Sequence, residues 1–270
     1  MVKKIIKLIN ANKCALRKTI GLRVNNQRRR GKNHPNNGNI PCTNCTYQSS
    51  CPVYCLVANA SAPSDCPIIW KTYLPGQRVV DEGEPNVGVH VVCNGVGMQT
   101  ILDDSGTEYM VDLLGTGELI ELADMVLATK TYSASASTLA KTQFGFASRE
   151  MINAQIERDN AFILKIAQQL SRKIKRLEVL YNNLQSRTVS DRLAHIFLQL
   201  ADMVRPGIVK EIGLPIRLKR TTLGQLVCTA PETASRSLVR LRQKGLISQK
   251  DHEFIIPDRK RLADAIGRID

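Results

Sequence analysis

Long apolar runs are missing from this sequence of 270 residues. A membrane-spanning helix needs about 18 or more consecutive apolar residues, and since no such run occurs, no membrane partner is expected. The sequence also has no glycine-rich nucleotide-binding loop and no arrangement of Ser, His and Asp typical of a hydrolase, which argues against an enzyme. The short segment Val2–Ile9 contains three lysines and is followed by no cleavage signal. The expected location is therefore the cytoplasm.

Acidic residues are missing from the start of the chain. Residues 1–41 hold 11 Lys or Arg and no Asp or Glu, residues 71–148 hold 4 basic against 10 acidic residues, and residues 187–270 hold 16 against 9. The net charge of +14 favours polyanions, and the C-terminal excess fits phosphate contacts. The Asn-rich basic tail, residues 1–41, is expected to be disordered, and it either holds DNA non-specifically or is simply solvated.

Residues 219–248 follow the pattern of a helix-turn-helix. Thr221 or Thr222 can cap a short first helix. Thr229–Pro231 forms a turn that places Pro at the first position of the next helix, and Glu232–Lys244 continues that second helix. Residues after it suggest two short strands around a polar turn, which is typical of a winged helix.

The second helix has one apolar and one polar face. Its apolar residues fall three or four apart and can pack inward, whereas its polar residues point away from them. Early positions of a recognition helix reach base edges in the major groove, where Glu accepts from cytosine, Arg binds guanine and Ser adapts. An amphipathic surface helix that happens to carry Arg is the alternative. The residues expected to contact DNA are Thr222, Glu232, Thr233, Ser235, Arg236 and Arg240.

A long helix is predicted from Arg149 to about Gln185, because no Pro or Gly interrupts it. Its heptad positions are Ile156, Ile163, Leu170, Leu177 and Leu184, and its intermediate apolar positions are Ile166, Ile174, Leu180 and Tyr181. This repeat predicts a two-stranded coiled-coil dimer interface, with a core helix of one domain as the alternative. The opposite face is expected to be exposed and polar, with Arg172, Lys173, Lys175 and Arg176. A two-fold dimer would place two recognition helices about one DNA turn apart on a palindromic operator.

Between Tyr73 and Phe146, turn signals recur every ten residues or so, which predicts an antiparallel roll or jelly roll. The turns are Leu74–Gly76, Glu82–Pro85, Cys93–Gly95, Asp103–Gly106 and Leu114–Gly117. With the long helix and the winged helix, the expected fold class is α+β.

Residues 71–266 resemble the CRP/FNR superfamily of bacterial transcription regulators, related to the cyclic-AMP receptor protein and the fumarate and nitrate reduction regulator. The resemblance rests on the triplet Glu232, Ser235 and Arg236, in a second helix that follows a long heptad helix and a β-rich domain. Because Ser235 stands where the other branch has Gly, the triplet looks like the FNR-like branch, which reads TTGAT-type half-sites. The resemblance implies a homodimeric regulator, not an enzyme, with double-stranded DNA and RNA polymerase as partners.

In this family the roll is the effector domain, and Gly117–Leu119 matches the start of its cyclic-nucleotide cassette. Relatives that bind cyclic nucleotides place an Arg-Ser or Arg-Thr pair downstream to hold the phosphate, since Arg offers a bidentate fork. The matching stretch here, Tyr132–Ser135, has no Arg, and Lys130 nearby is only a point charge. A cyclic nucleotide is therefore not expected, and the roll would transmit a signal sensed elsewhere.

Five of the eight cysteines fall within 25 residues, at Cys42, Cys45, Cys51, Cys55 and Cys66. Thiolates at this spacing can bind one soft metal centre, either zinc or an iron-sulfur cluster. The spacing of the first three resembles that of the oxygen-sensing regulator of the FNR branch, which implies a [4Fe–4S] cluster. A structural zinc and a redox thiol switch remain the alternatives.

The fourth cluster ligand stays open. The relative takes its fourth Cys from a late strand of the roll, but the corresponding place here, near Gln143 and Phe144, has no Cys. The candidates are Cys55, Cys66, Cys93 and Asp65.

The predicted organisation has five parts: a basic tail (1–41), a Cys-rich sensor segment (42–70), a β-roll (71–148), a dimerisation helix (149–186) and a winged helix-turn-helix (187–270). The main hypothesis is a homodimeric transcription regulator that senses oxygen or redox state. One alternative is a regulator with structural zinc or a thiol switch and a small-molecule effector in the roll. A redox enzyme or electron carrier is the third.

Overall fold

The computed structural model describes residues 42, 45, 47–57, 68–216, 218–250 and 253–266. The predicted basic tail, residues 1–41, lies outside the described residues, and so do Asp65 and Cys66. The chain divides into a unit Met1–His34 and a unit Pro35–Asp270, and every element below belongs to the second unit. Among the described residues, no helix combines the length and apolar character that crossing a bilayer requires.

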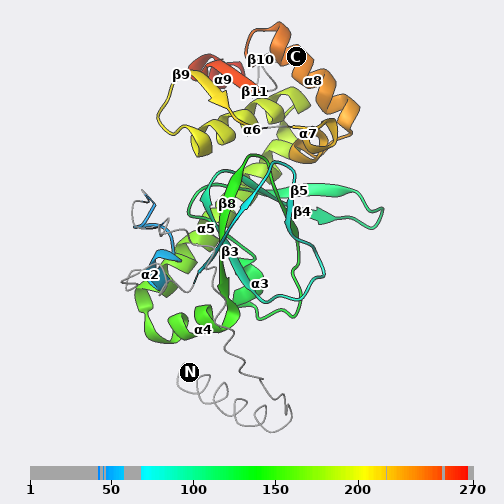
Figure 1. Ribbon diagram of the computed structural model, residues 1–270. Helices are drawn as coiled ribbons and strands as arrows, with labels where there is room; N and C mark the ends of the chain where they lie inside the picture. Colours follow the sequence, from blue (N-terminus) through cyan, green and yellow to red (C-terminus); the bar gives the residue numbers. More distant parts are fainter. Residues whose placement is uncertain are drawn as a thin grey trace. The chain divides into compact units, whose positions relative to one another are not determined.

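Two antiparallel four-stranded sheets form the roll (Figure 1). One sheet has the strand order β1-β8-β3-β6 and the other the order β2-β7-β4-β5. The strands are β1 (Ile69–Tyr73), β2 (Arg78–Val80), β3 (Gly88–Asn94), β4 (Gly97–Leu102), β5 (Glu108–Leu114), β6 (Leu119–Ile120), β7 (Ser135–Thr138) and β8 (Thr142–Ser148). Because all the pairings in both sheets are antiparallel, the predicted roll is confirmed.

Central strands of the roll are buried on both faces. In β3, Val89, Val91 and Val92 are all buried, as expected for a β-branched strand inside a sandwich core. The turn from β3 to β4 depends on Gly95, whose φ is +116°. A Cβ atom there would lie 2.5 Å from the Thr142 hydroxyl oxygen, so only glycine fits.

The long helix is interrupted, contrary to the prediction of one helix from Arg149 to Gln185. Asp159 adopts an extended conformation (φ −136°, ψ 103°) between the two helices α4 and α5. Its carboxylate accepts a hydrogen bond from the Ala161 amide at 2.9 Å, so it ends α4 and caps α5. The helices of this region are α2 (Tyr54–Val57), α3 (Leu122–Val126), α4 (Arg149–Arg158) and α5 (Asn160–Ser186).

Two adjacent faces of α5 differ in their contacts with the rest of the chain. The predicted heptad face is largely uncovered in the single chain, since Ile163, Leu177 and Leu184 are exposed. The expectation that Lys173 and Arg176 are exposed was wrong, because both are half-buried and bind the roll. Arg172 and Lys175 are exposed as expected, Ile166 is buried in the roll-side core, and Ile156, Leu170 and Leu180 are partly buried against core clusters.

The C-terminal part is a winged helix-turn-helix around one core that includes Phe197, Leu241 and Phe254. Its wing is a three-stranded sheet of order β10-β11-β9, one strand more than predicted. The elements are α6 (Val189–Val204), β9 (Lys210–Leu214), α7 (Arg220–Val227), α8 (Pro231–Gln243), β10 (Ser248–Lys250), β11 (Glu253–Asp258) and α9 (Arg259–Ala265).

The prediction that Thr221 or Thr222 caps the first helix of the helix-turn-helix was wrong. Helix α7 begins at Arg220, and its N-cap residue is Lys219, which makes no side-chain capping hydrogen bond. Thr221 and Thr222 therefore both lie inside the first turn of α7. By contrast, Pro231 stands at the start of α8 as expected.

Candidate DNA-binding surface and sensor site

Helices α7 and α8 meet at a close turn that sets the direction of the second helix. Cys228 ends α7 in the left-handed conformation, with φ +51°. A Cβ atom at Gly224 would lie 2.7 Å from the Thr229 carbonyl oxygen, so this crossing requires glycine. Sequence reasoning missed Gly224, although a glycine inside a short helix is unfavourable unless something approaches it closely.

Helix α8 buries one face and exposes the other. The buried residues that attach it to the core are Ala234, Ser237, Leu238 and Leu241. Glu232, Arg236 and Arg240 are exposed on the remaining surface, as predicted. Glu232 lies in the first turn and Arg240 in the last, which suits the dipole of the helix and leaves the basic residue free for a phosphate.

The smaller predicted contact residues are less accessible. Thr233 is half-buried, and its hydroxyl oxygen accepts a hydrogen bond of 3.4 Å from the Arg236 guanidinium. Ser235 differs from the expectation of an outward-pointing side chain, since its hydroxyl oxygen is buried and has no hydrogen-bond partner among the described residues. Thr222 is half-buried on α7. The structure therefore brings Glu232, Thr233 and Arg236 together at the start of α8.

The Cys-rich segment folds as a series of tight turns followed by α2. Cys42 and Cys51 are buried, and Cys45 and Cys55 are half-buried. The Cys51 amide donates to the Tyr47 carbonyl oxygen at 2.8 Å. The Tyr47 amide donates to the Cys45 sulfur at 3.4 Å. Thiols separated by three and six positions in the sequence are thus held by backbone turns within one small segment.

Helix α5 shares an apolar core with this segment and also forms polar contacts with it through Lys165. The Lys165 ammonium group donates to the carbonyl oxygens of Gln48, at 3.3 Å, and Cys51, at 3.5 Å. It also lies over the ring of Tyr54, 5.9 Å from the ring centroid. Lys165 therefore joins the backbone around Cys51 to α5.

Cys93, on β3, lies beside the segment. It packs against the core cluster that contains Cys42 and Cys51. Burial raises the pKa of the Cys93 thiol, and the charges of the Cys42, Cys51 and Cys45 thiolates raise that pKa further. Cys93 therefore packs against the core that contains Cys42 and Cys51, and Cys55 packs against the same core.

Strand β8 carries Gln143 and Phe144 at the place where the relative has its cysteine, and Gly145 follows them. Gly145, next to the expected position, pairs with Val91 of β3. A Cβ atom at Gly145 would lie 2.2 Å from the indole ring of Trp70. The indole fills the space that a side chain at Gly145 would need, so position 145 of β8 cannot carry a thiol ligand.

Within the part of the chain that the structure describes, no group of three or more His, Cys, Asp or Glu side chains is gathered closely enough to hold a metal ion. The fit of a metal centre is therefore judged on the donor set. Cys42 and Cys51 belong to one core cluster against which Cys93 packs, and thiolate sulfur is the ligand that both zinc and iron-sulfur clusters accept.

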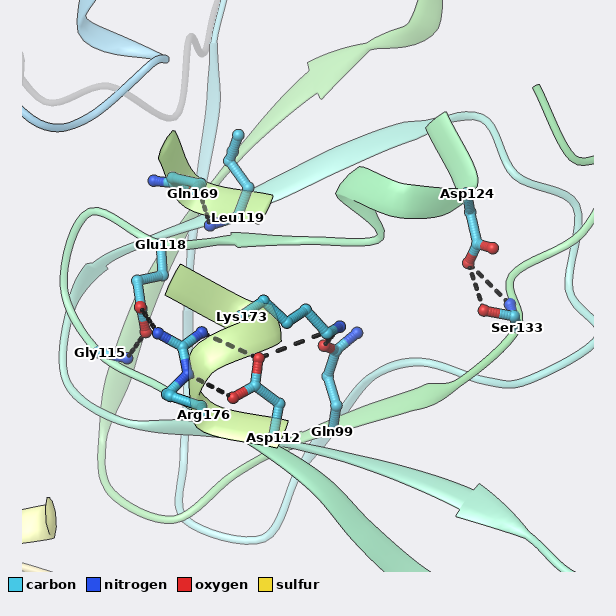
Figure 2. Close-up of polar contacts among 10 residues, drawn as sticks. All are labelled: Gln99, Asp112, Gly115, Glu118, Leu119, Asp124, Ser133, Gln169, Lys173 and Arg176. Atoms are coloured by element: carbon cyan, nitrogen blue, oxygen red, sulfur yellow. Dashed lines mark hydrogen bonds and ion pairs between the residues drawn. The ribbon is translucent and has the colours of Figure 1, made fainter. Parts of the chain in front are cut away.

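A cluster of polar side chains lies between the roll and α5 (Figure 2). Arg176 binds Asp112 in a bidentate pair, with N–O distances of 2.8 and 3.0 Å, and donates to Glu118 at 2.6 Å. Burial raises the pKa of Glu118, although the charge of Arg176 opposes this shift. Lys173 donates to the side-chain oxygen of Gln99 at 2.9 Å. These contacts attach one face of α5 to the roll.

Models of two known protein domains match this chain. The model of the cyclic nucleotide-binding domain matches residues 70–159, and that of the Crp-like helix-turn-helix domain matches residues 191–265. The two matches together cover more than half of the chain. The chain belongs to the CRP/FNR family of transcription regulators.

Relatives of this CRP/FNR protein are distant. It is 24% identical to the transcriptional activator protein Anr of Pseudomonas aeruginosa over 230 residues, and the matched region covers 84% of this chain and 92% of Anr. It is 24% identical over 184 residues to the cAMP-activated global transcriptional regulator CRP of Haemophilus influenzae, with 68% and 82% of the two chains covered. The solved structure of FixK2 from Bradyrhizobium japonicum has a TM-score of 0.61 at 19% identity, covering 73% of this chain and 96% of FixK2, and supports the fold.

As a CRP/FNR protein the chain is a DNA-binding transcription regulator, and the family consists of regulators rather than enzymes. The redox enzyme considered from the cysteines alone is therefore not retained. In the roll, the amide and the hydroxyl of Ser133 both donate to one carboxylate oxygen of Asp124, at 2.8 and 2.9 Å. Ser133 belongs to the stretch in which nucleotide-binding relatives carry their phosphate-binding pair, and here its donors are already used.

Proposed function

We propose that this CRP/FNR regulator is a homodimer that binds palindromic DNA and responds to oxygen or redox state through a [4Fe–4S] cluster. The thiols proposed to hold the cluster are Cys42, Cys45, Cys51 and Cys93. The observation that carries this proposal is that Cys93, on β3, packs against the core cluster that contains Cys42 and Cys51. Four thiolates are the ligand set that such clusters take, and within the described part of the chain these thiols would have to draw closer together to hold one.

DNA binding is assigned to the exposed face of α8. The proposed contacts are Glu232, Arg236 and Arg240, supported by Thr222, Thr233 and Ser235. The triplet in α8 favours TTGAT-type half-sites, and RNA polymerase is the expected protein partner of a regulator that works in the cytoplasm. Arg236 is suited to a bidentate contact with guanine, whereas Arg240 is suited to phosphate.

Dimerisation is assigned to the uncovered face of α5. Large apolar side chains remain exposed there in the single chain, which is unusual for a soluble helix unless a partner covers them. They include Ile163, Ile174, Leu177, Tyr181 and Leu184. The spacing of these residues matches a coiled-coil seam, which would bring two copies of α8 onto one palindrome.

The link between sensor and helix is Lys165. It joins the Cys-rich segment to α5 through the carbonyl oxygens of Gln48 and Cys51. A bound cluster would supply the oxygen-sensitive chemistry. The chain's own task is to hold the thiolates in place and to pass a change in the backbone around Cys51 to the dimer helix.

The test is the metal content of protein purified without air and then exposed to air. We expect iron and sulfide in equal amounts, together with a visible absorption that air bleaches. Cys93→Ser should lose most of the iron and the absorption, whereas Cys228→Ser, which changes a half-buried thiol in the DNA-binding domain, should keep both.

Stoichiometric zinc, or no metal, would contradict the cluster and move the sensor to a structural zinc or a thiol switch, with the DNA-binding assignment unaffected. Full iron content in Cys93→Ser would contradict only the assignment of Cys93. The fourth ligand would then be sought among Cys55, Cys66 and Asp65.

A further inference from the structure

Polar side chains of α5 enter the place where a nucleotide-binding roll would hold its ligand. Gln169, Lys173 and Arg176 are three or four positions apart, so they lie on one face of the helix, and all three contact the roll (Figure 2). The side chain of Asp112, which receives the bidentate pair from Arg176, is only 2% exposed. A charge buried to this extent is stable only with its partner in place.

The start of the cyclic-nucleotide cassette is fully engaged by these side chains. The Gln169 amide group donates to the Gly117 carbonyl oxygen at 2.6 Å and accepts from the Leu119 amide at 3.1 Å. One carboxylate oxygen of Glu118 accepts from Arg176, and the other accepts from the Gly115 amide at 2.8 Å. The polar groups of Gly117–Leu119 that point toward α5 are therefore satisfied within the chain.

The anion-binding part of the cassette is also engaged. Ser133 gives both its amide and its hydroxyl hydrogen bond to Asp124. A cyclic phosphate would have to displace this carboxylate. Its negative charge would also approach the Asp124 carboxylate, and two like charges repel each other.

We propose that Arg176, supported by Gln169 and Lys173, is an internal occupant of the effector site of the roll. The roll binds its own α5 in place of a cyclic nucleotide, so the position of the dimer helix against the roll is set without any small molecule. This goes beyond the sensing function proposed above, because it concerns the roll and holds whichever metal the cysteines bind.

The first test compares hydrogen exchange in the full-length protein and two matched variants. Arg176→Met should raise amide exchange roughly tenfold or more in residues 115–119 and along α5 from Gln169 to Asn183, because it removes the guanidinium from Glu118 and leaves Asp112 with only Lys173, 4.0 Å away. Arg172→Met, which changes an exposed arginine one turn earlier, should exchange like the wild type. Equal exchange in Arg176→Met and wild type would overturn the proposal.

The second test separates the ion pairs from simple packing. Adding Asp112→Asn and Glu118→Gln to Arg176→Met removes the two carboxylates that Arg176 binds, so the triple variant should regain much of the lost melting temperature. A further loss instead would contradict the proposal.

The third test uses the wild type, so it does not depend on any variant folding. We expect millimolar cyclic AMP or cyclic GMP to leave its melting temperature and its binding isotherm unchanged. A saturable shift with either nucleotide would show that the site is open to ligands, and would overturn the proposal while leaving the cysteine assignment untouched.

Discussion

At the scale of single residues, Glu121 shows how the roll accommodates an unfavourable charge. Its φ is +61°, its side chain is 1% exposed, and one carboxylate oxygen lacks a hydrogen-bond partner among the described residues. The other oxygen accepts from the His90 amide at 3.3 Å and lies 3.4 Å from the His90 ring nitrogen. Burial raises the pKa of Glu121, and the hydrogen bond from His90 only partly offsets this.

This raised pKa predicts the effect of Glu121→Gln. The folded pKa lies above the unfolded value, so the protonated carboxyl stabilises the fold fully below about pH 4.5, and that stabilisation is lost as pH rises through the folded pKa. The amide does not titrate. The free energy of unfolding of the variant, relative to wild type, should therefore increase between pH 5 and pH 8, which urea titrations at each pH would measure. The exposed Glu253→Gln is the control, and a difference that is constant with pH would refute the prediction.

The cysteines of the proposed metal site could be predicted only in part from the sequence. The spacing of Cys42, Cys45 and Cys51 is local and identifies them as candidate ligands directly. The choice of Cys93 needs the folded core, in which β3 packs against the segment that holds Cys42 and Cys51. Those contacts join residues far apart in the sequence, so no local pattern contains them.

At the scale of elements, the heptad repeat of α5 predicts the apolar face of the helix but not the contacts of its charged face. The repeat correctly identified a face of Ile163, Leu177 and Leu184 that stays uncovered in the single chain. Its charged neighbours were expected in water, which is the usual place for Lys and Arg. Arg176 instead meets Asp112, which is 64 residues earlier in the chain. The break at Asp159 was missed because a capping carboxylate outweighed an otherwise helical composition.

The uncovered face of α5 predicts how the dimer can be broken. Leu177 is 39% exposed in the single chain and lies at the centre of the proposed seam. Leu177→Glu would place two like charges opposite each other in the dimer, which costs several kcal/mol, so the dissociation constant should rise at least about tenfold. Gln168→Glu adds the same charge to an exposed position away from the seam and should leave the dimer intact. Analytical ultracentrifugation would measure both, and an unchanged dimer in Leu177→Glu would exclude this face.

At the scale of the whole molecule, the family architecture places a signal site and a DNA-binding site on one chain, joined by a helix. The fold class, the roll, the helical region and the winged helix could be predicted because each has a local signature: regular turns, a heptad repeat, and a turn with Pro231 at the start of the second helix. The internal contacts of the roll could not, since α5 and the sheets meet only after folding. Residues 1–41 add 11 basic residues to the charge of the molecule, and this segment lies outside the part of the chain that the structure describes.

Two copies of α8 acting on one palindrome predict the effect of Arg236→Ala. The guanidinium is exposed at the start of α8, and one bidentate base contact contributes about 1 to 3 kcal/mol. Because the dimer loses this contact in both half-sites, affinity for a TTGAT-type palindrome should fall by roughly thirtyfold or more. Weak binding should persist and weaken further with salt, since it depends on the remaining Lys and Arg.

Fluorescence anisotropy with palindromic and scrambled duplexes, at two salt concentrations, separates specific from non-specific binding. Arg205→Ala, an exposed arginine after α6, removes the same charge away from α8 and should keep the preference for the palindrome. If Arg236→Ala keeps it too, then α8 does not read the bases through this residue. If both variants lose affinity equally for both duplexes, Arg236 contributes only charge, because a phosphate contact weakens all sequences alike whereas a base contact weakens one.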